Sequence, residues 1–319
     1  MKISVALATY NGAEFLAEQL QSLVAQRRLP DELVVCDDAS TDQTAAILRR
    51  FAEACPFEVR IEINPQTLGS AANFARAVAL CRGEVIALAD QDDLWLPEKL
   101  GTIERAMADE PRLGMVFSDA RLIDASGRRL SQRLWQAIGF DGPLQRRFAG
   151  RAAQVLVKRN VVTGATMAFR AAHRDLLLPV AGHWFHDGWF ALLLAAVAPC
   201  RAIAEPLMEY RQHAEQQIGA LKGSLPRRLD RAIQEGQQRL ETAAADYDLA
   251  GQRLAAFRTR LTDERLLTWL TEKAEHLRTR AQIRQSLVGR LPRIVGELVH
   301  GRYAKYSENG RAILQDLLL

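Results

Sequence analysis

Short apolar runs alternate with helical patterns along residues 1–118, and this alternation constrains the fold more than any other feature of the chain. The apolar runs predict buried strands at 3–8, 32–37, 59–63, 84–89 and 115–118. The spacing of apolar residues predicts helices at 14–25, 44–53, 70–81 and 97–108. Ser40-Thr-Asp-Gln43 predicts a capping box that opens the second helix. Regular alternation of strand and helix indicates an α/β fold whose sheet is mostly parallel.

The pattern changes after Asp119. Residues 124–160 contain glycines, a proline and paired arginines, which predict a loop-rich insertion. Further on, the sequence predicts a strand at 162–170, a buried helix at 189–197 and a short strand at 201–204. After Gly223 almost all residues favour helices. We therefore expect an α/β domain over 1–219 and a C-terminal helical extension over 220–319.

Charge is divided unevenly between these two parts. Residues 220–319 carry 18 Lys and Arg against 12 Asp and Glu, a net charge of +6, whereas residues 1–219 carry 24 against 26. Hydrophobic residues make up 48% of the chain, which excludes wholesale disorder, and the longest apolar run is too short to cross a bilayer. The four cysteines lack metal-site spacing, which predicts reduced thiols and a cytoplasmic location.

Polar segments follow three of the predicted strands, and two of these segments carry carboxylates. The first strand leads into Thr9-Tyr-Asn-Gly12, the second into Asp37-Asp-Ala-Ser40, and the fourth into Asp90-Gln-Asp-Asp-Leu-Trp95. Ligands bind beyond the carboxyl ends of strands in open parallel sheets, so these segments are expected to meet. Crowded carboxylates resist ionisation unless a cation joins them, and Asp-x-Asp offers the oxygen ligands that Mg²⁺ or Mn²⁺ prefers.

Each of these segments also has a plainer interpretation. An Asp-Asp pair can be a turn with a helix cap, Asp-Gln-Asp-Asp can be a solvated acidic turn, and Tyr10 can be a half-buried loop residue. The occurrence of all three at successive strand ends favours a binding site. No strand is followed by a glycine-rich dinucleotide fingerprint or a P-loop lysine motif, which disfavours a dehydrogenase or a P-loop kinase.

Together these segments resemble glycosyltransferase family 2. The resemblance rests on Ile3 to Gly12, Val35 to Asp42, Leu68-Gly69 with Asn73-Phe74, and Asp90 to Trp95, and it covers about residues 1–219. His186-Asp-Gly-Trp189 and Tyr210-Arg-Gln-His213 are similar to bacterial rhamnosyltransferase-like members. The resemblance implies the GT-A fold, an inverting reaction and a nucleoside-diphosphate sugar as donor.

The resemblance also implies roles for individual residues. Tyr10 and Asp38 would hold the nucleoside base, and Thr9 and Asn11 would shape its pocket.

In the same way, Asp90 and Asp92 would form the metal and diphosphate motif, with Asp92 as the direct ligand of Mg²⁺ or Mn²⁺. Asp93 would support them or contact the sugar. His213 would contact the metal or the diphosphate, with Arg211 as a second cation; the alternative is that His213 is a surface histidine.

Asp187 matches the family's catalytic base. An inverting transfer needs a carboxylate that takes the proton of the acceptor hydroxyl. Asp187 stands just before the predicted helix 189–197, and a helix N-terminus favours the ionised form by roughly 0.3–1 kcal/mol. The alternative is that Asp187 only caps this helix. Trp95 and Trp189 are candidate sugar platforms, although core packing is the safer interpretation for Trp189.

The basic extension 220–319 has two interpretations. It is either a solvated helical hairpin packed on the catalytic domain or a surface that contacts anionic lipid peripherally on the inner face of the membrane. Apolar residues at 266, 267, 269, 270, 313, 314 and 317–319 would rest at that interface. Few aromatic residues and no recognisable module argue against nucleic acid as a partner.

The sequence thus predicts an inverting glycosyltransferase. It would move a hexose, with rhamnose as the favoured sugar, from a nucleoside diphosphate to a polysaccharide or a lipid-linked glycan. The alternatives are a sugar-nucleotide-binding or scaffold subunit without turnover, and a nucleotidyltransferase. The intact metal motif and base argue against the first, and the absence of a glycine- and lysine-rich loop argues against the second.

Overall fold

The computed structural model describes residues 1–213, 229–285 and 289–318. Among these residues, nine strands form one sheet in the order β3-β2-β1-β4-β8-β6-β9-β5, with β7 paired to β6. The strands are β1 (Ile3–Thr9), β2 (Glu32–Asp37), β3 (Glu58–Ile63), β4 (Val85–Ala89), β5 (Leu94–Trp95), β6 (Met115–Asp124), β7 (Arg129–Arg133), β8 (Met167–Arg170) and β9 (Cys200–Gln212).

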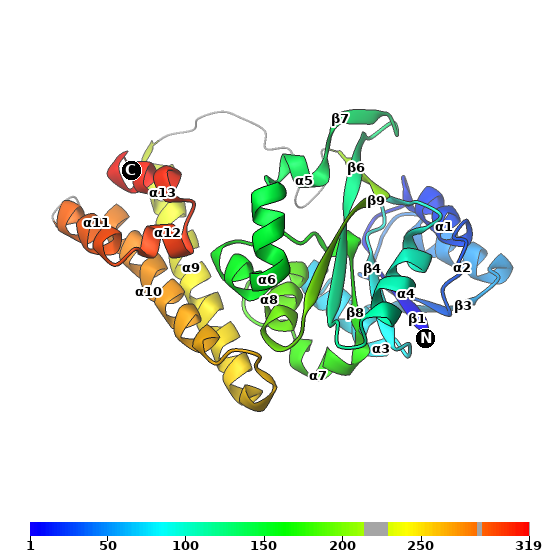
Figure 1. Ribbon diagram of the computed structural model, residues 1–319. Helices are drawn as coiled ribbons and strands as arrows, with labels where there is room; N and C mark the ends of the chain where they lie inside the picture. The colour runs from blue at the N-terminus through cyan, green and yellow to red at the C-terminus, as the bar shows by residue number, and fades with distance from the viewer. Residues whose placement is uncertain (214–228, 286–288, 319) are drawn as a thin grey trace.

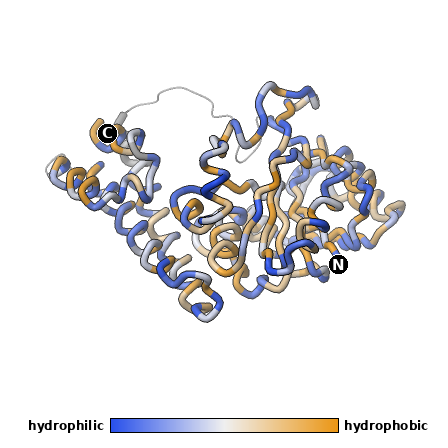
Figure 2. Tube along the Cα trace, viewed as in Figure 1, coloured by the Kyte–Doolittle hydropathy of each residue, from blue (hydrophilic) through white to orange (hydrophobic). Residues whose placement is uncertain are grey.

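The sheet is mostly parallel, as the sequence predicts. β3, β2, β1 and β4 pair in parallel, and so do β6 and β9. β8 lies antiparallel between β4 and β6, and β5 and β7 are antiparallel to their neighbours. All residues of β2 and β4 are buried, which explains their largely apolar sequences. Figure 2 shows the hydrophobic residues concentrated in these central strands.

Helices cover both sides of the sheet (Figure 1). Those of the first part are α1 (Leu16–Val24), α2 (Thr44–Ala54), α3 (Ser70–Leu80), α4 (Lys99–Asp109), α5 (Leu134–Ala137), α6 (Gly142–Lys158), α7 (Arg174–Leu177) and α8 (His186–Val197). The C-terminal helices are α9 (Leu229–Ala256), α10 (Arg265–Gln285), α11 (Arg290–Val299), α12 (Arg302–Tyr306) and α13 (Asn309–Leu318). They form a bundle beside α6 and α8, at the opposite end of the molecule from β3 (Figure 1).

Several local predictions are wrong. The region 124–160 is not loop-rich, because it contains β7, α5 and the 17-residue helix α6. Gly142-Pro143 begins that helix rather than marking a turn, and the side chain of Asp141 accepts a hydrogen bond from Leu144 N at its N-terminus. The expected strand at 162–170 is confined to β8, and the expected short strand at 201–204 is part of the 13-residue β9.

The predicted capping box is also wrong. The N-cap of α2 is Gln43, without a side-chain cap bond. Ser40 turns back instead, donating from its hydroxyl to Asp37 Oδ1 over 2.6 Å and accepting from Asn11 N over 2.9 Å. The side chain of Ser40 therefore joins the loops after β1 and β2 rather than starting a helix.

The C-terminal helices are tied to the sheet domain. Lys158 Nζ donates to Ala304 O over 2.7 Å, and α10 packs against α6. Leu266 and Leu270 are each 1% exposed and belong to the core, so the predicted interfacial face around them is wrong. The predicted boundary between 219 and 220 and Leu319 lie outside the described residues. In the described part of the chain, no helix combines the length and apolar character needed to cross a membrane.

Candidate active site

A cavity of about 1020 Å³ opens at the carboxyl edge of the parallel strands. Its walls come from the loops after β1, β2 and β4, from the N-terminus of α8, and from α5 and the C-terminal helices. The predicted site residues on its wall are Thr9, Tyr10, Asp38, Asp90, Asp92, Asp187 and His213. Single small-molecule sites are about 300–1,000 Å³, so this cavity lies at the upper limit of that range.

Three predicted residues lie outside this lining. Asn11 sits in a strained left-handed conformation (φ 45°), and its side-chain oxygen accepts from Thr41 N over 2.8 Å. Asp93 is fully buried behind the wall, where it accepts from Arg211 N over 3.0 Å. Both residues therefore shape the loops around the cavity.

Arg211 is not placed as a second cation in the cavity. Its guanidinium is buried, pairs with Glu18 at 2.7 Å and stacks over the ring of Phe15. Its Nε donates to Asp92 O over 2.8 Å. Together with the bond from its own N–H to Asp93, this makes Arg211 a positioning residue for the Asp-Gln-Asp-Asp loop.

The backbone of Tyr10 is held at one end of the cavity by the side chain of Gln91. The Gln91 side chain accepts from Tyr10 N over 2.8 Å and donates to Tyr10 O over 3.0 Å. A Cβ at Gly12 would lie 2.2 Å from Gln91 Oε1, so a larger residue there would displace the Gln91 amide from these bonds. The ring of Tyr10 is 49% exposed, which leaves it available for stacking.

Asp38 braces the neighbouring loop. Its carboxylate accepts from Asn64 Nδ2 over 2.7 Å, from Leu68 N over 2.7 Å and from Gly69 N over 2.9 Å. These three bonds bring the 64–69 segment to the cavity wall, where Thr67 and Gly69 appear. Asp38 is 2% exposed, so its first function is to fix the shape of this pocket.

The acidic residues beyond β4 are incompletely neutralised. Burial, then the charges of Asp92 and Asp187, raise the pKa of Asp90 to about 7, and burial raises the pKa of Asp93 well above its usual value. Lys99 lies beneath them, but burial lowers its pKa to about 7. In the described structure, buried Asp93 Oδ2 has no hydrogen-bond partner. Such a cluster favours the arrival of another cation.

The residues fit a divalent ion that is completed by substrate oxygens. His213 Nε2 lies 2.7 Å from Asp92 Oδ2, and both side chains line the cavity with Asp90. Within residues 1–213, 229–285 and 289–318, no three acidic, histidine or cysteine side chains form a preassembled metal site. Mg²⁺ is commonly held by one or two carboxylates together with substrate phosphates, and that requirement matches this pair of aspartates.

Asp187 lies in the first turn of α8 rather than before the helix. The N-cap is Phe185, so Asp187 does not cap the helix. Burial raises the pKa of Asp187 to about 6, and backbone N–H groups of Gly188 and Gly164 act in the opposite direction. A carboxyl group with such a pKa at a cavity wall is suited to accept a proton near neutral pH.

Gly164 and Phe185 lie beside Asp187, and of these two sequence reasoning missed Phe185. Gly164 has no room for a side chain, since a Cβ would lie 2.6 Å from His186 Nε2 and 3.4 Å from Asp187 Cβ. Phe185 is 48% exposed and lines the cavity, whereas Trp95 and Trp189 are buried. The exposed aromatic surface beside Asp187 therefore comes from Phe185, for which the only signal was an aromatic residue adjacent to the His-Asp pair.

The sheet, its strand-end cavity and the acidic loop define a GT-A type α/β protein. The chain belongs to the family described as glycosyl transferase family 2, whose model matches residues 4–177.

Curated relatives support this assignment. An uncharacterized glycosyltransferase of Nostoc sp. is 27% identical over 219 residues, covering 67% of this chain and 65% of the relative. An uncharacterized protein of Mycobacterium tuberculosis is 33% identical over 132 residues, 41% of this chain and 38% of its own length. The chain thus spans less than two thirds of each of these relatives. The dTDP-rhamnosyl transferase RfbG of Shigella flexneri is 27% identical over 231 residues, covering 67% of this chain and 74% of RfbG.

Solved structures share the fold. Residues 1–349 of S. aureus TarS in complex with UDP-GlcNAc align with a TM-score of 0.60 at 17% identity, covering 94% of this chain and 92% of that one. The mannosyltransferase PcManGT from Pyrobaculum calidifontis, in complex with GDP-Man and Mn²⁺, aligns with a TM-score of 0.51 at 20% identity, covering 99% and 83%. These similarities confirm the predicted GT-A fold, including the helical extension.

Proposed function

We propose that this protein is an inverting hexosyltransferase that uses a nucleoside-diphosphate sugar. The observation that carries the proposal is that Asp187, Asp90 and Asp92 line the same cavity as Tyr10 and Asp38. Residues suited to a base, to a cation and to a nucleotide are therefore gathered around one space. The cavity volume of about 1020 Å³ is at the upper limit for a single ligand site, which supports a large donor such as a nucleoside-diphosphate sugar.

In this proposal the acceptor hydroxyl attacks the anomeric carbon of the donor in a single displacement. The new bond joins the acceptor oxygen to that carbon, while the bond from the carbon to the diphosphate oxygen breaks. Asp187 takes the hydroxyl proton, and the nucleoside diphosphate leaves with the bonding electron pair. Asp90, Asp92 and His213 would hold Mg²⁺ or Mn²⁺, which when bound supplies Lewis-acid stabilisation of the leaving diphosphate. Tyr10 stacks on the base, and Asp38 keeps its pocket in shape.

Rhamnose is the sugar we favour, on the basis of the relative RfbG, which is named a dTDP-rhamnosyl transferase. A polysaccharide or a lipid-linked glycan is the proposed acceptor. A thermal-shift screen of nucleotide sugars with Mn²⁺ is expected to give the largest stabilisation with dTDP-rhamnose, lost when a chelator is added. Metal-dependent donor hydrolysis should accompany this binding. Binding without any turnover, even with acceptor extracts, would favour a scaffold subunit, and pyrophosphate release from a nucleoside triphosphate would favour a nucleotidyltransferase.

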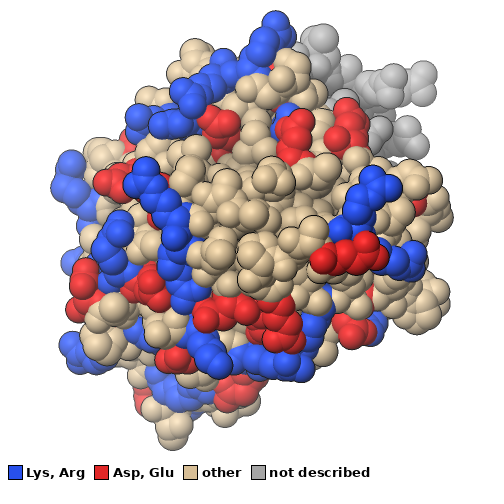
Figure 3. Space-filling model, turned by 90° about the vertical axis from the view of Figure 1, so that its right-hand side faces the viewer, with Lys and Arg blue, Asp and Glu red and all other residues tan. Residues whose placement is uncertain are grey.

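Peripheral contact with an anionic bilayer is the second part of the proposal. The exposed apolar side chains that would meet the bilayer lie on α13, as the sequence predicts, and also on α11. These side chains, 42% to 78% exposed, are Leu291, Val295, Leu298, Val299, Leu314, Leu317 and Leu318. Arg290 and Arg293 lie on the same helix as the first four, and cations near a lipid surface contribute about 1 kcal/mol each. By contrast, the N-terminal face mixes both charges (Figure 3).

Vesicle sedimentation tests this contact. We expect the protein to pellet with phosphatidylglycerol vesicles in low salt and to remain in solution with phosphatidylcholine vesicles. A V295S/V299S variant removes apolar surface from α11 and should weaken binding by about tenfold. Equal partition into both kinds of vesicle, or no effect of the double variant, would contradict an anionic interfacial role for α11.

A further inference from the structure

We propose that Arg159 and Arg311 form a subsite for the phosphate group of a lipid-linked acceptor, an inference that rests on the proposed function and specifies its acceptor. Both arginines line the active-site cavity, together with Glu308. Arg159 follows α6, whereas Glu308 and Arg311 come from the junction of α12 and α13. The C-terminal extension therefore supplies part of the wall of the catalytic cavity.

The three side chains form one cluster. Arg159 Nη1 lies 3.3 Å from Glu308 Oε1, and the two side chains are 29% and 53% exposed. Arg311 N donates to Glu308 O, so the two residues, three apart in sequence, lie one turn apart at the start of α13. Arg311 is exposed, and no described side chain or carbonyl pairs with its guanidinium. Two guanidinium groups against one carboxylate leave a net positive charge.

This charge contrasts with that of the residues proposed to hold the donor. Asp38, Asp90 and Asp92, which follow β2 and β4, give that part of the cavity an acidic wall. A donor diphosphate needs a cation there, whereas an anion at Arg311 would find its counter-charge in the protein itself. Guanidinium groups bind phosphate with short, charge-assisted and often bidentate hydrogen bonds. The cluster therefore selects an anionic group on the second substrate rather than on the donor.

Apolar surface next to this cluster points to a lipid as the bearer of the phosphate. Ile138 is partly exposed and lines the same cavity, next to Gly139, whose carbonyl accepts a hydrogen bond from Arg159. Beyond Arg311 on α13, Leu314 is 56% exposed and Leu318 is 69% exposed. A phosphate at Arg311 would thus lie beside a path of apolar side chains that leads out to the proposed lipid-facing surface.

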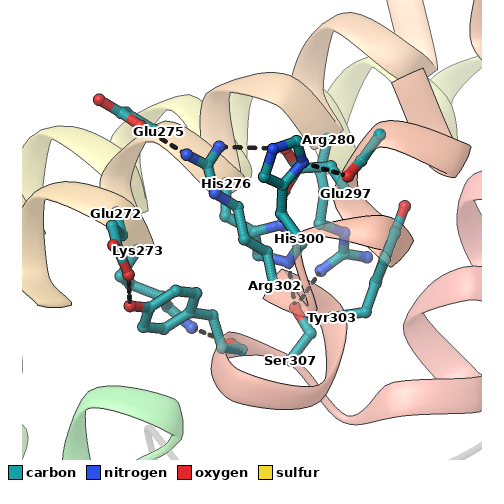
Figure 4. Close-up of polar contacts among 12 residues, drawn as sticks. Glu272, Lys273, Glu275, His276, Arg280, Glu297, His300, Arg302, Tyr303 and Ser307 are labelled. Atoms are coloured by element: carbon teal, nitrogen blue, oxygen red, sulfur yellow. Dashed lines mark hydrogen bonds and ion pairs between the residues drawn. The ribbon is translucent and has the colours of Figure 1, made fainter. Parts of the chain in front are cut away.

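A buried polar network holds this wall in place (Figure 4). His276 on α10 contacts Glu297 through Nδ1 and Ser307 Oγ through Nε2, the latter at 2.8 Å. Arg280 on α10 pairs with Asp316 of α13 at 2.6 Å. Ser307 immediately precedes Glu308, so these contacts fix the start of α13 against α10. The backbone that carries Glu308 and Arg311 is consequently fixed before a ligand binds, which reduces the ordering cost to that of the side chains.

The test is calorimetric titration of dodecyl phosphate below its micelle concentration, in the presence of a chelator so that metal-dependent sites are silent. We expect R311Q and R159Q each to weaken binding by about tenfold or more. E308Q should strengthen binding severalfold, because the carboxylate that competes for Arg159 is removed. R239Q removes an exposed arginine of α9 outside the cavity and should leave binding unchanged.

Two comparison ligands identify the source of the anion. Inorganic phosphate lacks the chain, and dodecyl maltoside lacks the charge, so both should bind more weakly than dodecyl phosphate. Equal affinity for inorganic phosphate and dodecyl phosphate would overturn the lipid assignment. Unchanged binding in R311Q, or weaker binding in E308Q, would overturn the subsite itself. Donor hydrolysis by the wild-type protein with Mn²⁺ tests the proposed function separately, so either can fail alone.

Discussion

Replacing Asp187 by asparagine is expected to reduce sugar transfer by about 100- to 10,000-fold, the usual range for loss of a general base. The amide is nearly the same size as the carboxyl group but cannot take the proton of the acceptor hydroxyl. Nucleotide-sugar affinity, measured by thermal shift with Mn²⁺, should remain near that of the wild type, because Asp187 lies on α8 and not on the loops around Tyr10. Turnover near the wild-type rate would remove Asp187 from the role of base.

The pH dependence of the wild-type protein provides the control. Since burial raises the pKa of Asp187 to about 6, the carboxylate that accepts the proton is present above that pH and is lost below it. With donor and metal saturating, kcat should therefore fall as the pH drops through about 6. The residual rate of D187N should lack this step. An identical acid limb in both proteins would assign the titration to another group.

Replacing Asp92 by alanine is expected to remove the metal-dependent part of donor affinity. Asp92 offers its carboxylate to the cavity next to His213, at a distance of 2.7 Å, and the loss of even outer-shell partners of a metal commonly costs 10- to 100-fold in metal affinity. Titration of the nucleotide sugar with Mn²⁺ should show donor affinity weakened by about that factor. With a chelator present, wild type and D92A should bind the donor almost equally.

The matched control is D109A, which removes an exposed carboxylate at the end of α4, outside the cavity. D109A should retain the Mn²⁺-dependent affinity of the wild type, which separates a specific ligand from a general loss of negative charge. If D92A and the wild type bind the donor equally with Mn²⁺, Asp92 is not a metal ligand.

The first part of the fold could be predicted because local patterns and tertiary burial agree there. β2 and β4 are buried on both sides; β4 is a continuous apolar run, and β2 is apolar from Leu33 to Cys36. The prediction of a loop-rich region at 124–160 was wrong because Gly142-Pro143 was interpreted as a loop signal. A proline in the first turn and the Asp141 cap are equally signals for the start of a helix. β9 was predicted too short because its 13 residues are held extended by pairing with the 10 residues of β6, which depends on tertiary contacts.

The residues of the candidate site also differ in how well the sequence could predict their positions. Residues at strand ends, such as Asp90 and Tyr10, could be placed together since parallel strands bring their carboxyl ends to one edge. Arg211 could not be placed, because its direction is decided by Glu18 and Phe15 from a distant segment. Glu308 and Arg311 were missed for the same reason, as only the packing of α12 against α6 brings them to the cavity.

The side-chain amide of Gln91 joins the acidic loop after β4 to the loop that carries Tyr10. Gln91 stands between Asp90 and Asp92 in sequence, yet its side chain grips both the N–H and the carbonyl of Tyr10. A shift of the acidic loop is thereby transmitted to the aromatic ring through two hydrogen bonds. In the proposed mode of binding, the base and the diphosphate of one donor would meet two loops that these bonds join, so the separation of the two contacts would be fixed before the donor arrives.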